Sequence, residues 1–154
     1  MLKLEADINQ KHEKFIKEAV QNKLVYGLKS KDGFAVVGSN QYVDEEEEPI
    51  PVLCFWSNEA DAKLSGKKNW PKYKPKKISL ASFLENWCAG MYTEGDLAGT
   101  NFDWNLFGKE SDPLDLAIEL IKEIKRTNTN VQLEDYPDLD SLETQIRALL
   151  GDEQ

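Results

Sequence analysis

The sequence predicts an α+β protein: a single domain in which a four- to five-stranded mixed or antiparallel sheet packs with about five helices. The chain has 154 residues, about the length of one domain, and 40% of them are apolar, which is enough for one hydrophobic core. Apolar residues recur with helical spacing in several segments. Short apolar runs between these segments are bounded by glycine, proline and aspartate, as is typical of strands.

The first helix is predicted from about Asp7 to Asn22, because its apolar residues fall on one helical face. These residues are Ile8, Phe15, Ile16, Ala19 and Val20. His12 falls on the same face, one turn after Ile8. A lone histidine in that position is expected to be a packed residue rather than a catalyst.

A hairpin should follow this helix. Residues 24–28 and 34–37 form its two strands, and the Asp-Gly pair at 32–33 favours a tight turn between them. Residues 39–48 are expected to form a loop that ends in five consecutive acids. A third strand is predicted over 50–56, where apolar residues return.

A short helix is predicted over 58–65, with Ser57 as its N-cap and Gly66 at its end. Residues 67–77 are expected to form a basic, aromatic loop, because their two prolines disfavour a helix. A short strand is predicted at 76–79.

The clearest helix begins at its N-cap Ser79 and carries a continuous apolar stripe. The stripe consists of Leu80, Phe83, Leu84, Trp87, Cys88 and Met91. Residues 97–102 are predicted to form the last strand. A loop or turn is expected over 103–108.

Another helix should start at the N-cap Asp112, with Pro113 at its first position. The final helix is predicted to start at the N-cap Asp140, after a polar connector. We therefore divide the chain into an α+β region, 1–127, and a connector with a C-terminal helix, 128–154.

Charge is distributed unevenly along the chain. The net charge is −9, which disfavours generic nucleic-acid binding. Residues 57–77 nevertheless hold seven lysines and two acids, while residues 130–154 hold seven acids and one arginine. Three explanations stay open: solvated loops and faces, a bipolar surface that steers a charged partner, or an acidic tail that screens the basic patch.

The two cysteines do not indicate a metal site or a disulfide framework. Cys54 and Cys88 are not in a CxxC pair, and each has apolar neighbours, so both are expected to be buried free thiols. No apolar run is long enough to span a membrane, and the first residues are too charged for a secretory signal. A cytoplasmic location is therefore expected.

Candidate binding residues come from the aromatic side chains outside the helical stripes. Trp56, Trp70, Tyr73 and Trp104 are the residues we select, because tryptophan and tyrosine often anchor interfaces. The alternative is that they cover the edges of the core. Lysines near Trp70 and Tyr73 would also suit single-stranded nucleic acid, but the net charge argues against this.

Three groups of motifs together resemble a known family. They are Tyr26–Leu28 with Asp32–Ala35; Ile50–Val52 with Phe55–Ser57, Ala60 and Trp70–Pro75; and Ile78–Leu80 with Phe83–Trp87. Over about residues 10–110 the chain is similar to DUF2750, a bacterial domain of unknown function. The resemblance implies a cytoplasmic bacterial protein and brings no catalytic residues with it.

Several side chains are candidates for catalysis. A pairing of His12 with Cys54 or Cys88 is disfavoured by their apolar surroundings. Carboxylates at Asp96, Asp103 and Asp112 follow or precede Asn101, but spacing alone does not bring them together. No metal-binding or cofactor-binding motif is present, so neither a metal nor a cofactor is expected.

The sequence favours a non-catalytic protein-interaction module, immunity-like or regulatory, that docks a charged, aromatic-rich surface on a protein partner. The alternative is a small-ligand-binding protein, or a small enzyme, with a pocket near Trp56 and Trp70. A third hypothesis is self-association through the C-terminal helix. No feature indicates a membrane partner.

Overall fold

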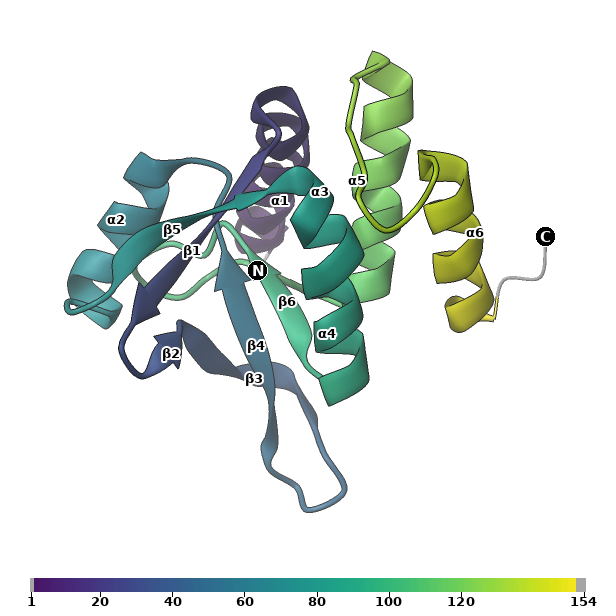
Figure 1. The fold of residues 1–154 in the computed structure, drawn as a ribbon. Helices are drawn as coiled ribbons and strands as arrows, with labels where there is room; N and C mark the ends of the chain where they lie inside the picture. The colour runs from purple at the N-terminus through teal and green to yellow at the C-terminus, as the bar shows by residue number, and fades with distance from the viewer. Residues whose placement is uncertain (1, 152–154) are drawn as a thin grey trace.

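The structure, a computed structural model, describes residues 2–151 and has the α+β fold predicted from the sequence. Its strands divide between a three-stranded sheet and a four-stranded sheet, with helices packed around them (Figure 1). Within residues 2–151, every helix is too short or too polar to cross a membrane.

The three-stranded sheet is antiparallel. Its order is β2 (Gly33–Phe34), β1 (Leu24–Ser30) and β5 (Lys74–Ser79). The turn from β1 into β2 ends at Gly33, whose φ of 124° suits a residue without a side chain. The turn predicted from the Asp-Gly pair is therefore confirmed, but the second strand of the hairpin is shorter than predicted. Residues 36–37 pair with a strand of the other sheet and not with β1.

The four-stranded sheet is mixed. Its order is β3 (Val36–Val43), β4 (Pro49–Phe55), β6 (Leu97–Thr100) and β7 (Lys109–Ser111). β4 and β6 are parallel, and the other neighbours are antiparallel. Parallel neighbours need a long crossover connection, and helices supply it between β4 and β6.

The two sheets are joined at two points. Ala35 lies between β2 and β3, accepts a hydrogen bond from the Cys54 N–H and donates one to the Leu28 carbonyl. Tyr26 and Trp56 exchange two backbone hydrogen bonds of 2.8 Å. The ends of β1 and β4 are thereby held together.

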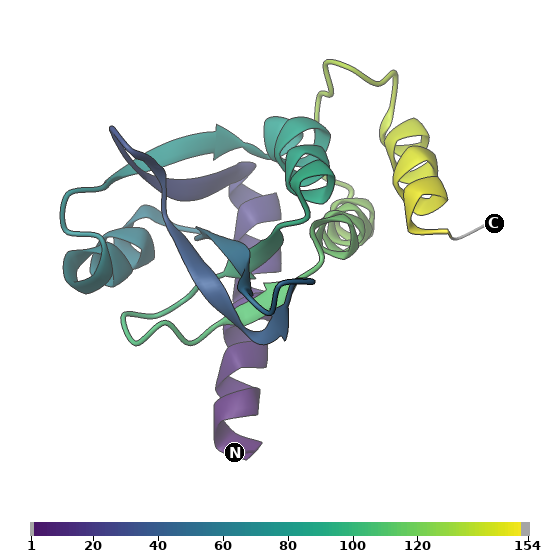
Figure 2. The ribbon, with the colours of Figure 1, turned by 90° about the horizontal axis from the view of Figure 1, so that it is seen from below.

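The helices pack on both sheets and on one another. They are α1 (Leu2–Asn22), α2 (Glu59–Asn69), α3 (Leu80–Ser82), the π-helical turn η1 (Phe83–Trp87), α4 (Cys88–Glu94), α5 (Pro113–Thr127) and α6 (Leu139–Leu150). Figures 1 and 2 both place α6 on the outer side of α5 and α2 at the opposite end of the molecule.

The core consists of two hydrophobic clusters. The larger one joins α1, α4, α5 and α6 to the sheet, and within it Phe83 makes edge-to-face contacts with Phe15 and Phe55. The smaller one surrounds Trp56 and contains Trp70. Burial of these aromatic side chains supplies much of the stabilisation of the fold.

The N-caps of two helices are as predicted. The Ser79 hydroxyl accepts a hydrogen bond from the Ser82 N–H, and the Asp112 carboxylate caps α5 ahead of Pro113. Both caps act within one turn of the chain, so local sequence is sufficient to identify them.

Several predicted boundaries are wrong for identifiable reasons. The N-cap of α2 is Asn58 and not Ser57, because Ser57 bonds to other parts of the chain. Gly66 does not end this helix: it lies within α2 against Leu28, where an added Cβ would approach to 3.0 Å. Asp138, and not Asp140, caps α6, while Asp140 pairs with Lys125.

Strand content is also larger than predicted. Residues 39–43 belong to β3 and not to a loop, because pairing with β4 resumes beyond a bulge. Glu110 holds this bulge by accepting bonds from the Ser39 hydroxyl and the Asn40 N–H. The short strand β7, which carries Glu110, was not predicted.

The C-terminal segment packs on the body of the protein. Leu142 and Ile146 of α6 are buried in the larger cluster. The buried Glu85 carboxylate accepts hydrogen bonds from the N–H groups of Glu134 and Asp135, at 3.1 and 2.8 Å. Residues 128–151 are therefore held by both apolar and polar contacts.

Replacing Glu85 should loosen the connector. We expect Glu85→Ala to lower the free energy of unfolding by about 1–3 kcal/mol, because two backbone donors lose their acceptor. Hydrogen exchange at Glu134 and Asp135 should accelerate. Urea denaturation and amide exchange measure these effects, with Asn86→Ala as the control; unchanged exchange at both amides would contradict this role for Glu85.

Candidate functional site

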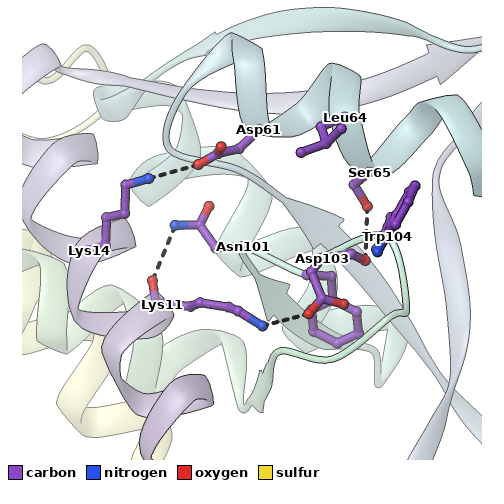
Figure 3. A pocket seen from close by; sticks show the side chains of 9 residues that line it. Lys11, Lys14, Asp61, Leu64, Ser65, Asn101, Asp103 and Trp104 are labelled. Atoms are coloured by element: carbon purple, nitrogen blue, oxygen red, sulfur yellow. Dashed lines mark hydrogen bonds and ion pairs between the residues drawn. The ribbon is translucent and has the colours of Figure 1, made fainter.

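A recess of about 420 Å³ opens between α1, α2 and the loop of residues 101–108, which joins β6 to β7 (Figure 3). We call it the Trp104 recess. Its lining residues are Lys11 and Lys14 from α1; Asp61, Leu64 and Ser65 from α2; and Asn101, Phe102, Asp103 and Trp104 from the loop. Charged, polar and apolar groups thus meet in one concavity.

Two ion pairs cross the Trp104 recess. The Lys11 Nζ lies 2.8 Å from Asp103 Oδ2, and the Lys14 Nζ lies 2.9 Å from Asp61 Oδ2. Lys11 and Lys14 are three residues apart on α1, so both side chains emerge on the same face of that helix. Each lysine therefore links α1 to a different wall of the recess.

Local hydrogen bonds hold Asp103 in an ionised state. Burial raises the pKa of its carboxyl, but bonds from Lys11 and from the Phe107 and Asn105 N–H groups outweigh burial, so the pKa lies below its ordinary value. The two N–H groups donate to Oδ1 at 3.0 and 2.9 Å. Asp103 thus shapes the loop with one oxygen and pairs with Lys11 through the other.

The same loop is also tied to α2. The Ser65 hydroxyl donates to the Asp103 carbonyl, and the Asn69 amide donates to the Trp104 carbonyl at 2.8 Å. These bonds fix the backbone on both sides of Trp104. The wall of the recess is therefore preformed.

Asn101 joins the three elements that surround the recess. Its side-chain amide donates to the Lys11 carbonyl at 3.1 Å, and its Oδ1 accepts from the Ser57 N–H at 3.0 Å. Its own N–H donates to the Phe55 carbonyl. Asn101 adopts a left-handed φ of 49°, a conformation that asparagine tolerates better than most residues.

The four aromatic residues selected from the sequence occupy different environments. Trp104 is 51% exposed and lines the recess, with the Lys68 ammonium 5.6 Å from its ring centroid. Trp56 is fully buried and Trp70 is 8% exposed, so both belong to the core. Tyr73 packs on Trp70 with ring centroids 6.5 Å apart.

Trp56 nevertheless supports the recess from behind. Its indole N–H donates to the Phe102 carbonyl at 2.8 Å, and Phe102 lines the recess. Sequence reasoning associated Asp103 with Asn101, and the structure brings both to this site. No sequence pattern indicates Lys11, Lys14 and Asp61, because only the packing of α1 against α2 and the loop brings them together.

A second polar cluster lies between α1, β6 and α5. His12 contacts the Thr100 hydroxyl through Nδ1 at 2.8 Å and the Glu119 carboxylate through Nε2 at 2.9 Å. This order of hydroxyl, imidazole and carboxylate resembles a catalytic triad, but Thr100 is fully buried and no substrate can reach its hydroxyl. We therefore assign the cluster a structural role.

The cysteines take no part in this cluster. Both are buried free thiols, as predicted, and burial raises the pKa of each thiol well above its ordinary value. Such thiols are unreactive at neutral pH. Among residues 2–151, no group of three or more histidine, cysteine or carboxylate side chains is arranged to hold a metal ion.

Comparison with known proteins identifies one relationship. A family model described as "Protein of unknown function (DUF2750)" matches residues 12–120, which include the residues of the Trp104 recess apart from Lys11. No curated protein matches the chain, and no solved structure does.

Substitution of Asn101 should separate the contribution of its side-chain hydrogen bonds from that of its left-handed backbone conformation. We expect Asn101→Gly to lower the free energy of unfolding by about 1–3 kcal/mol, because the buried Ser57 N–H loses its acceptor. Asn101→Ala should cost roughly 1 kcal/mol more, because alanine is strained at positive φ. Urea denaturation measures both.

Asn128 offers a matched control for the backbone contribution. It caps α5 with a similar φ of 55°. Asn128→Gly should have little effect, and Asn128→Ala should show the strain alone. A loss at Asn101→Gly no larger than that at Asn128→Gly would show that the Asn101 side chain does not hold these elements together.

The pH dependence of stability should contain a contribution from Glu119. Burial raises the pKa of this carboxyl, but its bond to His12 and the nearby Lys109 and Lys122 outweigh burial, so the folded-state pKa lies below the ordinary value of 4.5. The contribution is therefore fully present above pH 4.5 and is lost as pH falls through the folded-state pKa.

Glu119→Gln tests this dependence. The stability difference between wild type and the variant, measured by urea denaturation from pH 7 to pH 3, should shrink as the pH falls. A difference that stays constant over this range would show that the Glu119 charge does not stabilise the fold.

Proposed function

The chain belongs to the DUF2750 family, a family of unknown function, and we propose that it is a non-catalytic protein that binds a small molecule in the Trp104 recess. One observation carries the proposal: charged and polar side chains from three separate elements converge beside an exposed tryptophan in a single preformed concavity. Concave sites with a few convergent polar groups are the usual places where proteins bind small ligands.

The volume and the walls of the recess support this proposal. Its volume of about 420 Å³ lies within the range of known ligand pockets, roughly 300–1,000 Å³. Leu64 and Trp104 provide exposed apolar contact, while Phe102 lines the recess but is only 2% exposed. The bonds that fix the loop to α2 reduce the entropy that would be lost on binding.

The protonation states in the recess favour binding over catalysis. The pKa of Asp103 lies below its ordinary value, which makes this carboxylate a poor proton acceptor at neutral pH. A hydrogen bond to Asp61 raises the pKa of Lys14, so its amine stays protonated and is not a nucleophile.

A protein-interaction module is the second candidate, and exposed apolar side chains favour it. Leu64 and Trp104 are 58% and 51% exposed at the mouth of the recess. The exposed Lys68 of α2 lies beside this surface, with its ammonium group over the Trp104 ring. On this view a side chain of an acidic partner protein would occupy the recess.

Two further expectations complete the proposal. Buried free thiols at Cys54 and Cys88 support a reducing cytoplasm as the compartment. Self-association through α6 is less well supported, because its Leu142 and Ile146 pack on the chain's own core. An interface there would have to use the half-exposed Leu149.

Trp104→Ala tests the proposed site. In a ligand-observed NMR screen of a chemically diverse library, we expect compounds that bind wild type and that bind Trp104→Ala at least about tenfold more weakly, a loss of about 1.4 kcal/mol. Tyr92→Ala is the matched control, because Tyr92 is an exposed aromatic residue on α4, outside the recess.

The outcomes separate the two candidate functions. Ligands that bind all three proteins equally, or no ligand at all, would contradict small-molecule binding in the recess. A protein captured from the native host by wild type and Tyr92→Ala, but not by Trp104→Ala, would then favour the interaction module.

A further inference from the structure

The charges that line the Trp104 recess balance one another. Two ammonium groups, Lys11 and Lys14, face two carboxylates, Asp61 and Asp103. The chain as a whole carries a net charge of −9. The Trp104 recess is therefore lined by balanced charges although the protein is strongly acidic.

The two ion pairs differ in their exposure. The side chains of Lys11 and Asp103 are 28% and 35% exposed, and those of Lys14 and Asp61 are 48% and 39% exposed. Ion pairs that are this accessible contribute little stability, so a ligand can insert between the partners at small cost. Lys11–Asp103 is the less exposed of the two pairs, so a charge left without a partner there costs more than one left in the Lys14–Asp61 pair.

This balance selects against ligands with one charge. An anion that binds Lys11 would displace Asp103 and leave its carboxylate without a cation, and a cation that binds Asp103 would do the same to Lys11. A zwitterion avoids both costs, because its anionic group takes a lysine while its cationic group takes a carboxylate.

The arrangement of the walls indicates how a zwitterion would lie. In Figure 3 both lysines extend from α1, and Asp61 and Asp103 face them from α2 and from the loop. The ligand's carboxylate would therefore lie toward α1 and its ammonium group toward the two aspartates. The exposed apolar side chains of Leu64 and Trp104 lie beside these groups and would receive the rest of the molecule.

We infer that the Trp104 recess binds a free α-amino acid with a large apolar side chain. The inference rests on the proposed function and specifies the class of small molecule. The ligand's ammonium and carboxylate groups insert between the lysines and the aspartates, and its side chain packs on Trp104. Recognition thus requires both charges and the apolar group together.

Four related compounds test this inference on the 154-residue chain by isothermal titration calorimetry. L-Phenylalanine carries both charges, N-acetyl-L-phenylalanine lacks the ammonium group, L-phenylalaninamide lacks the carboxylate, and glycine lacks the side chain. We expect phenylalanine to bind at least about tenfold more tightly than each of the other three compounds.

Variants locate the charges that are recognised. Asp103→Asn retains Oδ1 as an acceptor for the loop amides but removes the negative charge. It should weaken phenylalanine binding at least about tenfold and reduce the preference for phenylalanine over N-acetyl-L-phenylalanine, a change that a merely structural role would not produce. Lys11→Met should reduce the preference over L-phenylalaninamide in the same way.

Lys63→Met is the matched control. Lys63 pairs with Glu59 at 2.9 Å on α2 but does not line the recess, so this variant should bind phenylalanine like wild type. Thermal unfolding of each variant shows whether it folds. A folded Asp103→Asn variant that binds phenylalanine as tightly as wild type would overturn the inference.

The remaining outcomes separate this inference from the proposed function. Equal affinity for the three phenylalanine compounds, or tightest binding of a compound with one charge, would overturn the inference that the ligand is a zwitterion. The proposal that the recess binds a small molecule would still stand. If none of the four compounds binds, but a different small molecule binds wild type and not Trp104→Ala, the amino-acid inference is overturned and the proposed function still stands. Absence of any small-molecule ligand would overturn both proposals.

Discussion

The side chain of Asn101 holds together the elements on which the rest of the structure depends. It bonds to the backbone of α1 at Lys11 and to the residue that precedes α2, Ser57, while its backbone continues β6. Ser57 in turn donates to Glu18 at 2.7 Å, which returns the network to α1. Because these groups are largely buried, each bond must form in the native arrangement or leave a polar atom unsatisfied.

Helix α1 consequently contacts the protein in two distinct ways. Phe15, Ala19 and Val20 pack into the larger hydrophobic cluster, which supplies attraction without much directionality. His12, through Thr100 and Glu119, adds directional bonds that set the rotation of the helix. The charged side chains of α1 that enter the recess depend on this rotation, so a polar network of structural character determines the geometry of the candidate site.

Much of the fold could be predicted from the sequence where the determinants are local. The apolar stripe after Ser79 and the Asp112-Pro113 start of α5 were read correctly, because caps and periodicity act over a few residues. Asn58 and Asp138 were missed as caps because Ser57 and Asp140 nearby are equally good candidates by residue type. Only long-range bonds decide between such neighbours.

The candidate site was less predictable for the same reason. Trp104 could be selected as an exposed aromatic residue of a loop, but Trp56 and Trp70 have the same residue type and are buried by tertiary packing. The pairing of Lys11 with Asp103 joins residues 92 positions apart. This separation in sequence also bears on folding, because the walls of the recess can meet only after α1 has docked on β6 and the loop that follows it. Contacts between residues so far apart in sequence slow folding, and the walls of the recess form together with the whole domain. A ligand that bound the folded recess would therefore stabilise the whole fold and not one loop alone.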